Sequence, residues 1–104
     1  MSNQPISEEY RIVAKNWVDA EAAASLLEDT KSAVLAQKMA ALGDMPVSKA
    51  EMQVKASDDW TDFIEKMVEA RKRANLLKVQ LEYIRMRSSE WSSFEASKRA
   101  EMRL

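Results

Sequence analysis

The stretch from Trp60 to Trp91, WTDFIEKMVEARKRANLLKVQLEYIRMRSSEW, decides the fold of this chain. Steps of three and four residues along it meet mostly apolar or small side chains, namely Trp60, Phe63, Met67, Ala70, Ala74, Leu77, Leu81, Ile84, Ser88 and Trp91. This spacing places them on one face of an α-helix for about four heptads, as in a coiled coil. Because a helix with one long apolar face needs a partner, the stretch predicts packing against another helix.

The composition supports an all-α fold and a single helical domain over residues 1–104. Hydrophobic residues make up 46% of the chain and charged residues 32%, which is too apolar for a disordered protein and too charged for a membrane protein. Only one glycine and two prolines interrupt it, and β-branched residues do not cluster as they would in strands.

The sequence contains no histidine and no cysteine. This removes the commonest general base, thiol nucleophiles and the usual zinc ligands, so we expect no enzyme, no catalytic residues, no cofactor or metal site and no small-molecule substrate. The first residues lack a basic segment followed by an apolar core, and no apolar run is long enough to span a membrane. We therefore expect a cytoplasmic protein.

A first helix is predicted from about residue 8 to residue 42. Ser7 is placed to cap it, and Glu8 and Glu9 then lie in its first turn, where the helix dipole favours carboxylates. Its apolar face contains Tyr10, Val13, Trp17, Ala20, Ala24 and Leu27. Gly43 falls where a left-handed residue would end the helix.

A turn over residues 43–48 is expected to lead into a second helix from about residue 49 to residue 103. Ser48 and Glu51 have the spacing of a capping box, and Val47 and Met52 that of a hydrophobic staple around it. Breaks are conceivable at residues 57–59, where Ser57 could cap a new helix, and at residues 88–89. The absence of glycine and proline favours continuity through both places.

Two long helices joined by a short turn predict an antiparallel hairpin. A turn centred near Met45 places Trp17 opposite Ala74 and Tyr10 opposite Leu81. The second helix is then longer than the first, and residues 88–104 have no partner within the chain. This segment carries the predicted partner or oligomer interface, Trp91, Phe94, Met102 and Leu104. We expect an oligomer, most simply a dimer that forms a helical bundle.

The charges are unevenly distributed. Residues 1–65 contain 6 basic and 12 acidic residues, and residues 66–104 contain 10 basic and 5 acidic residues. The basic residues Arg71, Lys72, Arg73, Lys78, Arg85 and Arg87 could contact a nucleic acid through its phosphates. They could instead flank the apolar face and pair with Glu9, Glu21 and Glu28 of the first helix, which is the favoured interpretation.

Two further groups allow a functional and a structural interpretation. The acidic residues Asp58, Asp59, Asp62 and Glu65 could bind a cation or imitate a nucleic-acid backbone, but they also suit the first turns of a helix. Trp17, Trp60 and Trp91 could line a ligand pocket, but tryptophans at apolar helix positions are more often core or interface anchors.

The runs LEYIRMR at residues 81–87 and EASKRAEMRL at residues 95–104 resemble the C-terminal parts of small helical proteins encoded in bacteriophage and prophage genomes. The resemblance covers about a third of the chain and implies a phage accessory protein that contacts viral or host machinery. Taken together, the sequence predicts a non-enzymatic helical interaction and oligomerisation module. The alternative is a nucleic-acid-binding accessory protein, active in recombination or packaging.

Overall fold

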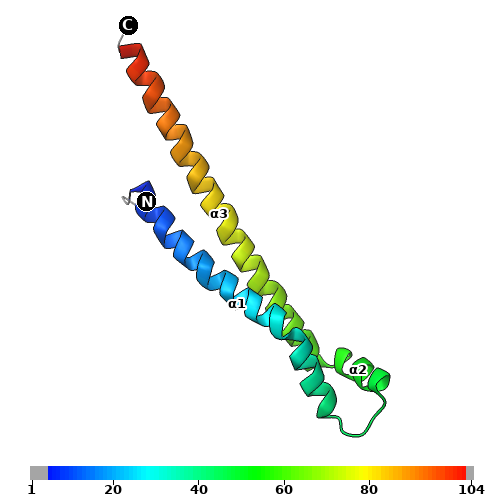
Figure 1. The fold of residues 1–104 in the computed structure, drawn as a ribbon. Coiled ribbons are helices and arrows are strands. Elements are labelled where there is room, and N and C mark those ends of the chain that lie inside the picture. The colour runs from blue at the N-terminus through cyan, green and yellow to red at the C-terminus, as the bar shows by residue number, and fades with distance from the viewer. Residues whose placement is uncertain (1–4, 103–104) are drawn as a thin grey trace.

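The computed structural model describes residues 5–102, which form three α-helices: α1 (Ile6–Ala40), α2 (Val47–Lys55) and α3 (Asp58–Met102). The long helices α1 and α3 pack side by side and antiparallel, and the short helix α2 lies beside the end at which the chain turns (Figure 1). The all-α class and the antiparallel arrangement of two long helices are therefore confirmed. The predicted two-helix hairpin is corrected to three helices.

The molecule is a rod with extents of 84 × 22 × 19 Å. Its radius of gyration is 23.1 Å, whereas a compact domain of this length would have about 13 Å. Such a shape buries few residues, because each long helix has only one neighbour over most of its length. The largest fully buried side chain in the described part of the chain is that of Ile84.

The connection after α1 follows the sequence prediction at one point and departs from it at another. Gly43 has a φ of 84°, the left-handed conformation expected there. The capping box is wrong, because within residues 5–102 no side chain caps the N-terminus of α2. The helix begins earlier than predicted, at Val47, and the Pro46 carbonyl accepts the first helical hydrogen bond, from the Ala50 N–H at 2.9 Å.

The start of α1 shows the same difference. The sequence predicts Ser7 as its cap, but α1 begins at Ile6 and the Pro5 carbonyl accepts hydrogen bonds from the backbone N–H groups of Glu8 and Glu9, each at 3.0 Å. A proline at the N-cap position thus precedes both helices. Its fixed φ suits a helix start, so the serine that follows falls inside the first turn.

The second half of the chain is not one continuous helix. Residues 56 and 57 separate α2 from α3, and the Ser57 hydroxyl accounts for the new start. It donates a hydrogen bond to the Val54 carbonyl at 2.6 Å and accepts one from the Trp60 N–H at 3.2 Å. The hydroxyl therefore serves the end of α2 and the beginning of α3 together. The conceivable break at residues 88–89 does not occur, since α3 continues through both serines.

The core between α1 and α3 consists of two clusters. In one, Ala20, Ala24 and Ala74 meet, and Ala24 and Ala74 have no exposed surface. The other cluster is built from Val13, Leu81 and Ile84, with Ile6, Tyr10, Ala14, Trp17 and Leu77 packed against it. Three alanines in contact let the two helices approach closely, so they mark the tightest part of the hairpin.

This packing corrects the predicted register. Tyr10 does lie in the cluster of Leu81, but Trp17 lies in that cluster as well, and Ala74 meets Ala20 and Ala24 in its place. The pairing differs from the prediction by about one helical turn. The cause is the break at Ser57, because a register counted from a turn at Met45 assumes a continuous second helix.

Candidate interaction surface

The part of α3 that extends beyond α1 is the clearest candidate for a binding surface. We refer to residues 88–102 as the overhang; Figure 1 shows α3 continuing past the N-terminal end of α1. Trp91 and Phe94 are each 58% exposed and Met102 is 78% exposed. The Trp91 and Phe94 rings stack with their centroids 6.0 Å apart, which presents them as one aromatic surface. Leu104, the fourth predicted interface residue, lies outside the described residues.

The first helix reaches further along α3 than the sequence predicted. Ile6, at the start of α1, lines a surface pocket together with Arg87, Glu90, Trp91 and Phe94. The apolar side chain of Ile6 thus lies at the base of the overhang. It leaves more than half of each aromatic side chain exposed, so Trp91 is not buried against its own first helix.

A groove separates the N-terminal end of α1 from α3 at the beginning of the overhang. It is lined by Ile6, Ser7, Tyr10, Ile84, Arg85, Ser88, Ser89 and Ser92. The apolar face of α3 has a serine at residue 88, where a large apolar side chain would be needed to fill the space between the helices. The small polar side chains therefore leave the two helices incompletely packed at this end.

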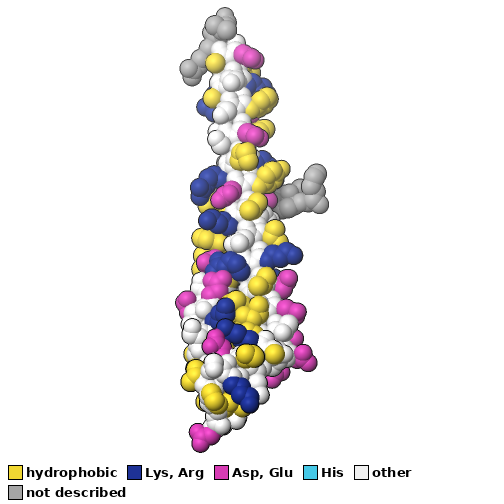
Figure 2. All heavy atoms as spheres, turned by 90° about the vertical axis from the view of Figure 1, so that its right-hand side faces the viewer, with side chains coloured by type: hydrophobic (Ala, Val, Ile, Leu, Met, Phe, Trp, Pro, Cys, Tyr) yellow, Lys and Arg dark blue, Asp and Glu magenta, His cyan; other side chains and the backbone are white. Residues whose placement is uncertain are grey.

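A second apolar surface lies on the opposite face of α3. Leu76, Val79, Tyr83 and Met86 each follow a residue of the α1-facing side by two positions, which turns them about 200° away from it. All four are exposed, and we refer to them as the outer stripe. Figure 2, which views the molecule from the side on which α3 lies, shows apolar side chains among the charged ones along this face.

The outer stripe was not among the surfaces predicted from the sequence. Its signal is the spacing of three, four and three residues from Leu76 to Met86. The pattern is short, because Lys72 precedes it and Glu90 follows it at the next positions of the same face.

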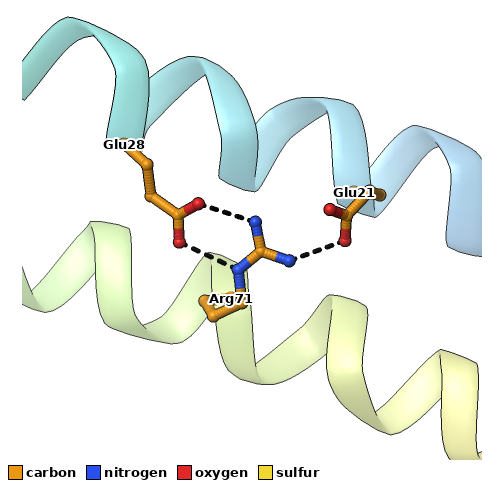
Figure 3. A network of polar contacts seen from close by, with 3 residues as sticks. All are labelled: Glu21, Glu28 and Arg71. Carbon is orange, nitrogen blue, oxygen red and sulfur yellow. Dashed lines mark hydrogen bonds and ion pairs between the residues drawn. The ribbon is translucent and has the colours of Figure 1, made fainter.

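Arg71 joins α1 to α3 through two carboxylates (Figure 3). Its Nε and Nη2 donate to the two oxygens of Glu28 at 2.8 and 2.7 Å, and its Nη1 donates to Glu21 at 2.6 Å. These hydrogen bonds, first that of Glu28 and then that of Glu21, raise the pKa of Arg71, and the Arg71 guanidinium lowers the pKa of Glu28. The bidentate geometry makes this the most specific polar contact between the helices.

Two other basic residues also contact α1. Arg87 donates to Glu9 at 2.5 Å, and Arg85 donates to the Tyr10 hydroxyl at 3.1 Å, a hydrogen bond that raises the pKa of Arg85. Three of the six residues predicted to contact nucleic acid thus bind side chains of the first helix. The other three, Lys72, Arg73 and Lys78, are exposed and form no ion pair with any described residue. Nucleic-acid contact by these six residues stays a prediction.

The remaining candidate groups do not converge on a site. Within residues 5–102, no group of three or more carboxylates lies close enough to hold a metal ion. The tryptophans have separate surroundings: Trp17 packs on the cluster of Val13 and Ile84, Trp60 is buried at the start of α3, and Trp91 lies on the overhang. The buried Trp17 Nε1 has no hydrogen-bond partner among the described residues.

Comparison of this chain with protein-family models, with curated proteins and with solved structures found no match. Among the described residues, no helix is both long and apolar enough to cross a membrane. The functional interpretation therefore depends on the geometry of the surfaces described above.

Proposed function

We propose that this protein is a non-enzymatic interaction and oligomerisation module that associates through the overhang. The observation that carries the proposal is the exposed aromatic pair of Trp91 and Phe94 on a helix that continues beyond its partner. Exposed, clustered aromatic side chains are typical anchors of protein interfaces, because they bury a large apolar area at a small cost in side-chain entropy. The rod shape adds support, since it leaves an unusually large part of the chain accessible.

Paired substitutions on α3 test this proposal. The variant Trp91→Ser/Phe94→Ser removes two exposed apolar side chains from the overhang, and Leu76→Ser/Val79→Ser removes two from the outer stripe as a matched control. Multi-angle light scattering should show an oligomer for the wild type and the control, and a lower mass for the overhang variant. Truncation after Arg87 should lower the mass in the same way.

Two results would contradict the proposal. One is an oligomeric mass that survives both the truncation and the loss of the aromatic pair. The other is a wild-type chain that stays monomeric across the accessible range of concentrations and captures no partner protein that the truncated chain fails to capture. Circular dichroism at 222 nm verifies that the variants remain helical.

The alternative function is that of a nucleic-acid accessory protein. It is supported by the exposure of Lys72, Arg73 and Lys78, since the binding of phosphates by these side chains would release counterions. Fluorescence anisotropy with labelled DNA and RNA at low salt should then show binding that weakens steeply as salt is added. The binding should also be lost on reversal of these three residues to glutamate. Unchanged anisotropy of the wild type would eliminate this alternative.

A further inference from the structure

The overhang has a charge pattern that is complementary to itself. The apolar face of α3 continues past α1 through Trp91, Glu95, Lys98 and Met102, at steps of four, three and four residues. Two charged residues of opposite sign thus lie in the middle, with a large apolar side chain on either side. Neither Glu95 nor Lys98 forms an ion pair with a described residue of its own chain. A helix that packs on this face must supply a base opposite Glu95 and an acid opposite Lys98.

We propose that the partner of the overhang is the overhang of a second copy of this chain, packed antiparallel about a two-fold axis between residues 96 and 97. In this register Glu95 faces Lys98 of the second copy, and Trp91 faces Met102 of the second copy. The axis repeats each contact, so two ion pairs and two Trp–Met contacts form. The inference rests on the proposed function, because it names the partner for the same surface.

The charges disfavour the parallel arrangement in register. Two parallel overhangs would place Glu95 against Glu95 and Lys98 against Lys98, and like charges at an interface disfavour association. The antiparallel arrangement pairs every charged residue of the face with its opposite. Because these pairs lie near the surface, they set the direction and register of the two helices more than they add affinity.

The surface pocket between Ile6 and the aromatic pair of Trp91 and Phe94 fits the same arrangement. Met102 of the second copy comes level with Trp91, where Ile6, Arg87 and Phe94 line a pocket. Methionine is flexible and packs well against aromatic edges, so it suits an irregular pocket of this kind. The overhang spans roughly 22 Å, which places the interface at the lower end of the size range of specific complexes, and we expect a concentration-dependent dimer.

A charge exchange tests the register. Glu95→Lys and Lys98→Glu should each raise the dimer dissociation constant by about tenfold or more, because each variant sets like charges against one another. An equimolar mixture of the two variants should dimerise again, since the two basic side chains of one copy then face the two acidic side chains of the other. The double variant Glu95→Lys/Lys98→Glu should dimerise by itself, like the wild type. Lys98 is exposed and Glu95 is partly buried, and circular dichroism verifies that the substitutions leave the fold intact.

Spin-label distances test the direction without any charge change at these two positions. The chain has no native cysteine, so single substitutions Ala96→Cys, Ser89→Cys and Glu82→Cys, which share one side of α3, can each carry one label. In the antiparallel dimer, the separation of the two labels along the helix axes should increase by about 21 Å for each step of seven residues away from the two-fold axis, so the label-to-label distance should rise from residue 96 to residue 89 and again to residue 82. A distance that stays constant along α3 would show a parallel dimer and overturn the inference.

The outcomes separate this inference from the proposed function. If truncation after Arg87 abolishes the dimer but the charge exchange has no effect, the overhang is the interface and the proposed register is wrong. If the dimer survives truncation and is lost with Leu76→Ser/Val79→Ser, the outer stripe is the interface and both proposals fall. Loss of dimer in each single variant with recovery in the mixture supports both.

Discussion

The core between α1 and α3 can be tested at Ile84, which is 1% exposed. Ile84→Ala removes three carbons, and at about 0.8 kcal/mol for each buried carbon this costs roughly 2.4 kcal/mol of stability. Ile84 also lines the open groove beside Tyr10, so neighbouring side chains and water can close over the gap, and we expect the cavity to add little. We therefore expect the free energy of unfolding to fall by about 2–3 kcal/mol, near the lower end of the range for such substitutions.

Urea and thermal unfolding followed by circular dichroism at 222 nm measure this loss. For a chain of this size, the expected change lowers the melting temperature by at least about 8 °C. All samples need the same protein concentration, because self-association makes the melting temperature concentration-dependent. Val68→Ala is the matched control on the same helix: Val68 is exposed, and we expect a change within about 0.5 kcal/mol. Equal losses in the two variants would refute the assignment of Ile84 to the core.

Three further predictions concern the helix contact, the pH dependence and the helix start. Ala74→Leu should overpack the contact with α1 and destabilise the protein by about 1–3 kcal/mol. The control Ala96→Leu, on the exposed overhang, should have little effect on the stability of the monomer. Urea unfolding measures both changes. Arg71 lowers the pKa of Glu28 in the folded state, so the pairing of these two residues stabilises the protein above the unfolded pKa of about 4.3. This contribution is lost as the pH falls through the lower pKa of the folded state. Melting temperatures measured from pH 7 to pH 2 should therefore fall less steeply in Glu28→Gln than in the wild type. Ser57→Ala should cost about 1 kcal/mol through loss of the Trp60 N–H acceptor, whereas Ser48→Ala should change stability by less than about 0.5 kcal/mol, both measured by thermal unfolding.

The apolar spacing from Trp60 to Trp91 predicted a long helix that packs on another helix, and the short turn near Met45 predicted that the two helices run antiparallel. Neither feature placed the register, because a register counted from a turn at Met45 assumes a second helix without the break at Ser57. The alanines at residues 20, 24, 70 and 74 also fit an offset of one helical turn. The observed offset also permits the bidentate contact of Arg71 with Glu28, which requires a particular distance between the two helices.

The helix starts were harder to predict than the helices. Ser7 and Ser48 satisfy the sequence pattern for a cap, but each lies two residues after a proline that is itself the N-cap residue, so each helix begins two residues earlier than predicted. Ser57 does act as a cap, and the sequence presented it only as an alternative to a continuous helix. A serine that caps a helix and a serine in the first turn of a helix have similar neighbours in the sequence. The surrounding structure determines which of them forms a hydrogen bond to the backbone N–H groups at the helix start.

For the candidate surface, the sequence predicted that Trp91, Phe94 and Met102 are not buried within their own chain, and all three are exposed. It also anticipated that Glu9, Glu21 and Glu28 pair with basic residues of the second long helix, as they do with Arg87 and Arg71. The outer stripe was missed because its only signal is the helical spacing of four apolar residues. Charged residues stand at the next position of the same face on either side, so the pattern is too short to be recognised easily.

The elongated shape has a consequence for every measurement of assembly. A radius of gyration of 23.1 Å is the size expected of a compact globule of several hundred residues, on the order of four to five times the length of this chain. A single copy will therefore leave a gel-filtration column earlier than a compact protein of the same mass, at a volume that globular standards assign to an oligomer. Elution position alone would mistake the monomer for an assembly, whereas scattered intensity or sedimentation equilibrium reports its true mass.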